Sequence, residues 1–284
     1  MKSFVMVTGV SSGIGLDCAR LLLKQGYRVI GSLRSPEDVR RLGAELGDDF
    51  MPLLLDVSNP QALPEALRQV EAWVGGEGLA ALVNNAGIAS PCGPLLLQPL
   101  DEIRGMFEVN LFGLLAVIQA FAPLLGAYPG SERPGRVINL GSVSGRVATP
   151  LTGSYAASKH ALEALSDALR IELAIYGIEV VLIEPGPIRT AIWSKAPDYA
   201  CYDGSDYQAG LAALGKLMAA NAERGAAPAM VSRAILRAIE APRPKARYPL
   251  HPMWHLGRWL PTRLLDRLMA RRVGLPAKRR VARR

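Results

Sequence analysis

The N-terminal segment constrains the fold of this chain more than any other stretch. A short apolar run, Phe4 to Val7, is followed at once by a glycine-rich turn and then by apolar residues at helical spacing. When a strand leads through such a turn into a helix, free backbone amides and the positive end of the helix dipole can hold a pyrophosphate. A turn without a ligand is the alternative, but the strand before it and the helix after it favour phosphate binding. The expected contacts come from Thr8, Gly9, Ser11, Ser12, Gly13, Ile14 and Gly15.

The same alternation of apolar runs and amphipathic segments continues along the chain. Strands that alternate with helices at this spacing form a parallel sheet covered on both faces, with ligands at the carboxyl ends of the strands. We therefore predict an α/β fold, a Rossmann-like doubly wound parallel sheet of about seven strands. One domain over 1–250 is expected, with a lid at about 188–227 and a C-terminal extension over 251–284. The further strand-like runs are 26–32, 51–55, 81–83, 136–140 and 179–183.

The residues after the second and third strands indicate which dinucleotide would bind. An acid after the second strand would accept the ribose hydroxyls of NAD and repel a 2′-phosphate. The chain has Leu33 there, followed by Arg34, whose guanidinium suits a phosphate. NADP(H) is therefore favoured over NAD(H), although Arg34 could also be a solvated loop charge. Asp56, beside Val57, could bind the adenine amino group or, with Ser58, start the next helix, and the two roles are compatible.

Two polar features interrupt the apolar patterns in the middle of the chain. The turn after the fourth strand, Asn84-Asn85-Ala86-Gly87, lacks bulky side chains, so a flat cofactor could lie against it. Its other interpretation is a strand-ending turn stabilised by asparagine side chains. Asn110 stands alone in an apolar helical segment, where it is either a local backbone clasp or part of a site.

Charge and cysteine content limit the classes of protein to consider. The net charge is +8, but the segment from Arg243 onward has thirteen Lys and Arg against one acid, Asp266, so it carries +12 and leaves −4 for the rest. This distribution does not indicate general nucleic-acid binding, and no nucleic-acid-binding motif supports it. The three cysteines lack disulfide or metal-ligand spacing, which favours a reducing compartment. With a strand already at Phe4 and no uninterrupted apolar run of about 18 residues, we expect a cytoplasmic protein without a membrane span.

The stretch from Ser142 to Lys159 contains a hydroxyl, a phenol and an ammonium group. Residues four apart on a helix are neighbours, so Lys159 should lie beside the phenol of Tyr155 and lower its pKa. Such a tyrosine can act as a general acid or base, and Ser142 could bind the same substrate oxygen. An ordinary amphipathic helix with an exposed Tyr and Lys is the alternative.

Together, these motifs resemble the short-chain dehydrogenase/reductase family over roughly residues 3 to 195. The resemblance rests on Thr8-Gly9-x-x-x-Gly13-x-Gly15, Asn84-Asn85-Ala86-Gly87, Asn110, Ser142, Tyr155-x-x-x-Lys159 and Pro185-Gly186. It implies that Tyr155 exchanges a proton with the substrate oxygen, while Lys159 lowers the phenol pKa and holds the nicotinamide ribose. Ser142 would orient the substrate oxygen, Asn110 would hold a water in a proton relay, and no metal would be needed. Implied cofactor contacts are Asn84, Ala86, Gly87, Tyr155, Lys159, Pro185, Gly186, Ile188 and Thr190.

Two regions near the C-terminus are expected to control access of the substrate. The aromatic residues of the lid, Trp193, Tyr199, Tyr202 and Tyr207, either line an apolar pocket or pack the lid onto the body. The extension contains a basic amphipathic helix pattern with flanking tryptophans. It could lie on an anionic membrane surface, close the substrate pocket or pack against another subunit. The predicted substrate contacts are Ser142, Val143, Tyr155, Ile192 and Trp193.

The sequence thus predicts an NADP-dependent oxidoreductase that interconverts an alcohol and a ketone or aldehyde. The segment 145–150 and the extension look most like the family branch that acts on steroids, retinoids and other lipophilic alcohols. One alternative is a 3-ketoacyl thioester reductase of lipid metabolism, in which the basic extension would receive an acidic carrier protein. Another is a non-catalytic NADP-sensing protein. The resemblance also implies a homodimer or homotetramer assembled through the helices that hold Asn110 and Tyr155.

Overall fold

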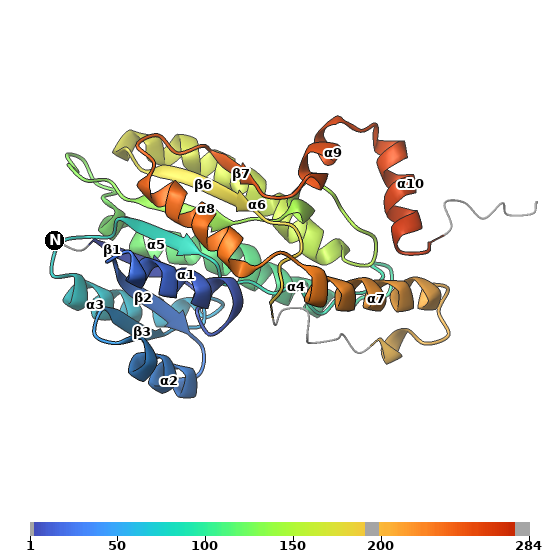
Figure 1. The fold of residues 1–284 in the computed structure, drawn as a ribbon, viewed down its shortest axis with the longest axis horizontal. Coiled ribbons are helices and arrows are strands. Elements are labelled where there is room, and N and C mark those ends of the chain that lie inside the picture. The colour runs from blue at the N-terminus through green and yellow to red at the C-terminus, as the bar shows by residue number, and fades with distance from the viewer. Residues whose placement is uncertain (1–2, 191–198, 276–284) are drawn as a thin grey trace, which may run out of the picture.

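The computed structural model describes residues 3–190 and 199–275, and its centre is a parallel sheet of seven strands in the order β3-β2-β1-β4-β5-β6-β7 (Figure 1). The strand order reverses between β1 and β4, which is where open α/β sheets bind their ligands. The predicted doubly wound sheet is confirmed, and β7 is the strand with no counterpart among the predicted runs. The strands are β1 (Phe4–Val7), β2 (Arg28–Leu33), β3 (Phe50–Leu54), β4 (Ala81–Asn84), β5 (Arg136–Leu140), β6 (Glu179–Glu184) and β7 (Arg247–Pro249).

Helices cover both faces of the sheet, with α1, α2 and α8 on one face and α3, α5 and α6 on the other (Figure 1). Val5 and Val7 of β1 pack in the first layer, and Phe4 and Met6 pack in the second, because successive strand side chains point to opposite faces. Burial on both faces explains the uninterrupted apolar run at the N-terminus. The helices are α1 (Gly13–Lys24), α2 (Pro36–Leu46), α3 (Leu63–Val74), α4 (Leu100–Phe107), α5 (Leu114–Phe121), α6 (Gly153–Glu172), α7 (Gln208–Arg224), α8 (Pro228–Glu240), α9 (Met253–Trp259) and α10 (Thr262–Arg272).

A continuous helical segment from Leu100 to Leu125 joins α4 to α5 through a π-helical turn, Glu108–Gly113. With a mean hydropathy of 1.7, it is long and apolar enough to cross a membrane, a test that core helices of soluble proteins also pass. In this fold, Val117 and Phe121 are buried in the core beside α3. Glu108 and Asn110 interrupt the apolar run, which is why the sequence did not predict a candidate span here.

The predicted lid contains α7, and its aromatic side chains attach it to the body of the protein. Tyr202 is buried in a cluster with Leu151, and Tyr199 and Tyr207 pack against that cluster. Of the two predicted roles for these three residues, the structure therefore shows packing of the lid onto the body rather than lining of the pocket. α7, α9 and α10 gather at one end of the molecule (Figure 1), beyond the carboxyl ends of β6 and β7. The predicted pocket residues Ile192 and Trp193 lie outside the described residues.

Candidate active site

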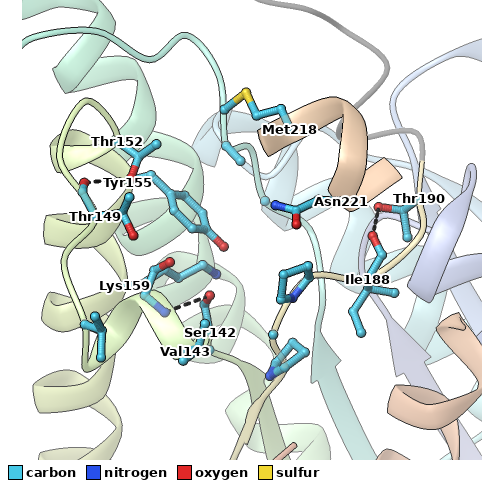
Figure 2. A pocket seen from close by; sticks show the side chains of 18 of the residues that line it. Ser142, Val143, Thr149, Thr152, Tyr155, Lys159, Ile188, Thr190, Met218 and Asn221 are labelled. Atoms are coloured by element: carbon cyan, nitrogen blue, oxygen red, sulfur yellow. Dashed lines mark hydrogen bonds between the residues drawn. The ribbon is translucent and has the colours of Figure 1, made fainter. Parts of the chain in front are cut away.

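Three polar side chains predicted to handle protons meet at the carboxyl end of the sheet. Tyr155 and Lys159 lie one turn apart on α6, and Ser142 follows β5. Figure 2 shows all three on the same side of a cavity that they line. The Ser142 hydroxyl is close enough to the Tyr155 phenol to favour its ionised form and so to oppose a higher pKa, and Ser142 Oγ accepts a hydrogen bond from the backbone N–H of Ser144 at 3.1 Å. The two hydroxyls are therefore held toward the same part of the cavity.

The acidity of Tyr155 differs from the prediction. Burial raises the pKa of the phenol and outweighs the opposite effect of the Ser142 hydroxyl. Lys159 Nζ lies 6.0 Å from the Tyr155 ring centroid and donates to the carbonyl oxygen of Leu140 at 2.7 Å. The predicted lowering of the phenol pKa by Lys159 is therefore wrong for this structure, and Tyr155 is protonated at neutral pH. Burial also lowers the pKa of Lys159 to about 8, although the carboxylate of Glu163 opposes this.

Asn110 clasps the backbone beside the site from within the π-helical turn. Its Oδ1 accepts a hydrogen bond from the backbone N–H of Ile88 at 2.8 Å, and its Nδ2 donates to the Ile88 carbonyl oxygen at 2.9 Å. The second proton of Nδ2 goes to Ser158 Oγ at 3.0 Å. The clasp is therefore present in the structure, and the water-relay role of Asn110 stays a prediction.

The glycine turn after β1 allows a ligand to approach the backbone closely. Gly9 and Gly13 have positive φ angles of 71° and 59°, a conformation that glycine adopts without a steric penalty. The backbone N–H of Gly9 donates to Ser32 Oγ at 3.0 Å, which braces the turn against β2. Gly15 lies so close to the turn that a Cβ atom there would be 2.2 Å from the Gly9 carbonyl oxygen. The predicted residues that line the adjoining cavity are Gly9, Ser11, Ser12, Gly13 and Ile14.

Two other predicted cofactor residues support the site from the core. Thr8 is buried, and its Oγ1 accepts a hydrogen bond from the backbone N–H of Asn85 at 3.0 Å. Asn84 is also buried and donates through Nδ2 to Asn139 Oδ1 at 2.9 Å, so its side chain does not face the cavity. Asn85 lines the cavity instead and donates through Nδ2 to the carbonyl oxygens of Thr8 and Gly9, each at 2.9 Å. The asparagine side chain beside the cavity is therefore one residue later than predicted.

The residues predicted for the adenosine end of the cofactor lie together. Arg34 is exposed and lines the cavity with Asp56 and Val57. Burial favours the protonated form of Asp56, but hydrogen bonds from Ser58 and the charge of Arg34 keep its pKa below the ordinary value. Asp56 Oδ1 accepts bonds from the Ser58 N–H at 2.9 Å and hydroxyl at 2.7 Å. Asp56 therefore stabilises a turn before α3 and lines the cavity at the same time.

The cavity beside the glycine turn continues into the cavity at Tyr155, since Ile14, Gly87 and Thr190 line both. Glycines in the left-handed conformation, the backbone amides at the start of α1 and the cation Arg34 fit a phosphorylated dinucleotide. These residues would hold the phosphates and ribose, and the shared wall leads toward Tyr155. Further predicted residues that line one or both cavities are Val143, Ala86, Pro185, Gly186 and Ile188.

The wall opposite Tyr155 comes from helices near the C-terminus. Figure 2 shows Met218 and Asn221 of α7 across the cavity from Tyr155. Helices α9 and α10 complete the wall, so the extension closes the pocket, one of the three roles predicted for it. The apolar spacing within α7 could have identified its contribution from the sequence. Lining residues that the sequence did not assign to the pocket are Leu214, Leu217, Met218, Asn221, Met253 and Arg272.

A buried pair of carboxyl groups, Glu163 on α6 and Glu184 at the end of β6, lies next to the site. Arg146 Nη2 and Arg247 Nη2 are each 3.1 Å from Glu163 Oε2, and the indole N–H of Trp254 in α9 donates to Glu184. Burial and the adjacent Glu184 raise the pKa of Glu163 to about 8, although the two arginines oppose this. The pair therefore keeps a proton at neutral pH and connects α6 and β6 to the extension.

Replacing Glu163 with Gln should make the free energy of unfolding less dependent on pH. The folded protein keeps the Glu163 proton up to about pH 8, whereas the unfolded chain releases it near 4.5. Because the folded state binds more protons in this window, this contribution to stability is complete below pH 4.5 and is lost as pH rises to about 8. Burial lowers the pKa of His251, so this histidine makes the unfolding free energy rise with pH. Its contribution is the same in the wild type and in Glu163→Gln, and it therefore cancels in the comparison.

Urea unfolding across this pH range measures the effect as the difference between wild type and variant. The matched control is Glu172→Gln, which removes an exposed carboxylate from the same helix. We expect the control to keep the wild-type pH dependence. Parallel stability curves for Glu163→Gln and wild type would contradict the assignment of a protonated carboxyl pair.

Comparison with known proteins agrees with this arrangement. A family model described as short chain dehydrogenase matches residues 3–199. The chain is 40% identical over 270 residues to an NADPH-dependent 3-dehydrocapnine reductase of Ornithobacterium rhinotracheale, covering 93% of this chain and 95% of that protein. It is 33% identical over 296 residues to retinol dehydrogenase 5 of Homo sapiens, covering 98% and 91%. A crystal structure of a short-chain dehydrogenase from Streptomyces avermitilis matches with a TM-score of 0.75 and 27% identity over 95% of each chain.

Proposed function

The chain belongs to the short-chain dehydrogenase family and is an oxidoreductase acting on CH–OH and C=O groups. From this premise we propose that it uses NADP(H) to interconvert an alcohol and a ketone or aldehyde on a lipophilic substrate. One observation carries the proposal. Ser142, Tyr155 and Lys159 lie together in a cavity with an apolar wall, and that cavity continues into the one beside the glycine turn.

The residues of the site divide the proton chemistry among them. In reduction, Tyr155 donates its phenol proton to the substrate oxygen, and in oxidation it accepts a proton from the alcohol. The raised pKa of the phenol favours the role of proton donor at neutral pH. Ser142 orients the substrate oxygen and favours the phenolate that remains after proton transfer, and Lys159 would hold the nicotinamide ribose of the cofactor. NADPH, when bound, supplies the hydride that makes this a reduction.

The lining of the cavity supports a lipophilic substrate. Val147, Leu214 and Met218 are among its apolar residues, and burying apolar substrate surface against such a wall is favourable by roughly 25 cal/mol per Å². The names of two relatives, a retinol dehydrogenase and a 3-dehydrocapnine reductase, point the same way.

A panel of ketones and aldehydes, assayed by the loss of NADPH or NADH absorbance, tests this function. We expect turnover with NADPH on medium-chain and long-chain carbonyl compounds and much weaker turnover on short, hydrophilic ones. Equal activity on both groups would contradict the lipophilic class, and no activity on any member would contradict the proposed reaction.

Replacing Arg34 with Ala should weaken NADPH binding by about tenfold and leave NADH binding nearly unchanged. An exposed, charge-assisted hydrogen bond to a phosphate contributes about 1.5 kcal/mol, which corresponds to roughly that factor. Fluorescence titration with each nucleotide measures the change. Arg40→Ala is the matched control, because Arg40 is an exposed cation of α2 outside the described cavity lining. An equal loss for both nucleotides in Arg34→Ala would argue against contact with the 2′-phosphate.

Assembly as a homodimer or homotetramer is part of the proposal. The helices that hold Asn110 and Tyr155 carry exposed apolar side chains, since Phe112 is 52% and Ile171 is 74% exposed. Burying such side chains between subunits would remove apolar area from water. Analytical ultracentrifugation tests this, and a monomer at all concentrations would contradict it.

Contact between the C-terminal extension and an anionic membrane surface is also proposed. Trp259 is 77%, Leu256 48% and Leu264 43% exposed, and the neighbouring arginines supply the positive charge that such a surface attracts. Flotation with anionic liposomes should recover the wild type but much less of a Trp259→Ser, Leu264→Ser double variant. Ile175→Ser removes an apolar residue of similar exposure outside the extension and should float like the wild type. Equal flotation of all three proteins would contradict the proposal.

A further inference from the structure

The cavity expected to receive the substrate carries charge of only one sign. Among the described residues that line it, the charged ones are Lys159 and Arg272, and none is acidic. Lys159 belongs to the proton-handling group. Arg272, the last residue of α10, has no part in that chemistry. The presence of this second cation in a largely apolar wall therefore requires another explanation.

Local contacts hold Arg272 at the cavity. Val273, which follows it, is completely buried and anchors the end of α10. Arg272 Nη1 lies 2.8 Å from Sδ of Met253, which also lines the cavity. After burial, the charge of Arg272 is the second cause of the lowered pKa of His251, whose ring packs against Gly186 in the cavity wall. The contact with Met253 and the charge felt by His251 thus place the guanidinium beside the wall formed after β6.

Arg272 also differs from the other arginines near the site. Arg146 and Arg247 form ion pairs with the buried Glu163. Within residues 3–190 and 199–275, Arg272 forms no ion pair with a carboxylate. Arg272 is exposed to solvent while it also lines the cavity. A neutral lipid in the cavity would give its guanidinium no hydrogen-bond acceptor of opposite charge, whereas an anionic group would accept charge-assisted hydrogen bonds from it.

Building on the proposed function, we propose that Arg272 binds an acidic group of the substrate, so that the enzyme acts on acidic amphiphiles in preference to neutral lipids. A carboxylate, sulfonate or phosphate would each match the planar guanidinium. Apolar residues of α7 accommodate the hydrocarbon chain of the substrate, and Ser142 and Tyr155 bind the oxygen that reacts. Arg272 is thus a specificity-determining residue contributed by the C-terminal extension.

Calorimetric binding of dodecanoate, dodecanesulfonate and methyl dodecanoate to the full-length protein with NADP⁺ present tests this proposal. The three probes share a hydrocarbon chain and differ in the charge of the end group. We expect the wild type to bind each acid at least about tenfold more tightly than the ester, because one charge-assisted hydrogen bond contributes enough free energy for this ratio. In Arg272→Ala the ratio should fall to about one. Arg272→Lys should keep part of the preference, because the charge remains without the bidentate geometry.

Arg271→Ala is the matched control, since it removes the adjacent exposed arginine, which is not among the described lining residues. It should retain the wild-type preference for acids. The proposal is overturned if the wild type binds the ester as tightly as the acids, or if Arg272→Ala keeps the preference. A weaker affinity of Arg272→Ala for NADP⁺ itself would assign the residue to the cofactor and overturn the proposal as well. If the acid preference depends on Arg272 but no ketone is reduced, the proposed function fails while the binding inference stands.

Discussion

The Tyr155→Phe variant is expected to lose turnover by about 10²- to 10⁴-fold while it still binds NADPH. Phe keeps the ring and removes the phenol hydroxyl, which lies near Ser142 and is the proposed proton donor. General acid catalysis contributes a factor of this size. Since no charge is removed and the ring volume changes little, the fold and the cofactor cavity should be unaffected. Single-turnover reduction of a carbonyl substrate, with a parallel NADPH titration, measures both properties.

Tyr176→Phe is the control for this substitution. Tyr176 lies in the short helix that follows α6, packs partly buried against the core, and is not among the described cavity-lining residues. Its loss should change turnover by less than about twofold, as expected for a substitution away from the chemistry. A Tyr155→Phe enzyme with near-normal kcat would overturn the assignment of the proton donor. A variant that has lost NADPH binding as well would show that the phenol also holds the cofactor cavity together.

The features that the sequence predicted correctly depend on residues close together in the chain. The apolar run, glycine turn and helix at the N-terminus form one local unit, β1 to α1, and its periodicity can be read directly. Tyr155 and Lys159 share a helix face because four residues span about one turn. The parallel sheet follows from the repetition of such units.

The side of the sheet on which the Asn84 side chain lies could not be predicted from the residues of its own strand. Strand side chains alternate between faces, so a one-residue shift exchanges the core and the cavity. Asn84 is paired in register with Asn139 of β5, and their side chains are hydrogen-bonded in the core. Asn139 in turn donates to Ser166 on α6. Only the pairing of strands far apart in sequence determines that Asn85 is the residue that lines the cavity.

The roles of the charged groups near the site could not be predicted from the sequence, because they depend on the tertiary structure. Glu163 and Glu184 belong to different elements, and neither has a sequence pattern that predicts a shared proton. Arg272 lies in a segment rich in basic residues, so its sequence does not distinguish it from Arg271. Both side chains are exposed, but of the two only Arg272 is among the described residues that line the cavity.

Gly15→Ala is the second substitution with a large expected effect, and it tests how the glycine turn is built. An added Cβ would lie 2.2 Å from the carbonyl oxygen of Gly9 and 2.5 Å from Nδ2 of Asn85. Asn85 Nδ2 donates to that same Gly9 oxygen at 2.9 Å. The methyl group therefore has to separate two hydrogen-bonded groups that hold the turn against the end of β4.

We expect Gly15→Ala to lose about 2–4 kcal/mol of unfolding free energy, from overpacking and the broken hydrogen bond together. NADPH affinity should fall by about 100-fold, equivalent to about 2.7 kcal/mol, because the displaced turn no longer presents its amides to the phosphates. Urea unfolding and nucleotide titration measure the two losses. Gly105→Ala is the control, since Gly105 lies in α4 with open space around its Cβ position.

The control should be neutral or stabilising by up to about 1 kcal/mol, because Ala favours the helix more than Gly does. Gly15 also lies in a helix and has no positive φ, so helix propensity alone would make its replacement stabilising too. The two substitutions therefore separate propensity from packing. If Gly15→Ala matched the control in stability and bound NADPH like the wild type, the close approach of α1 to the glycine turn would not be what positions the cofactor cavity.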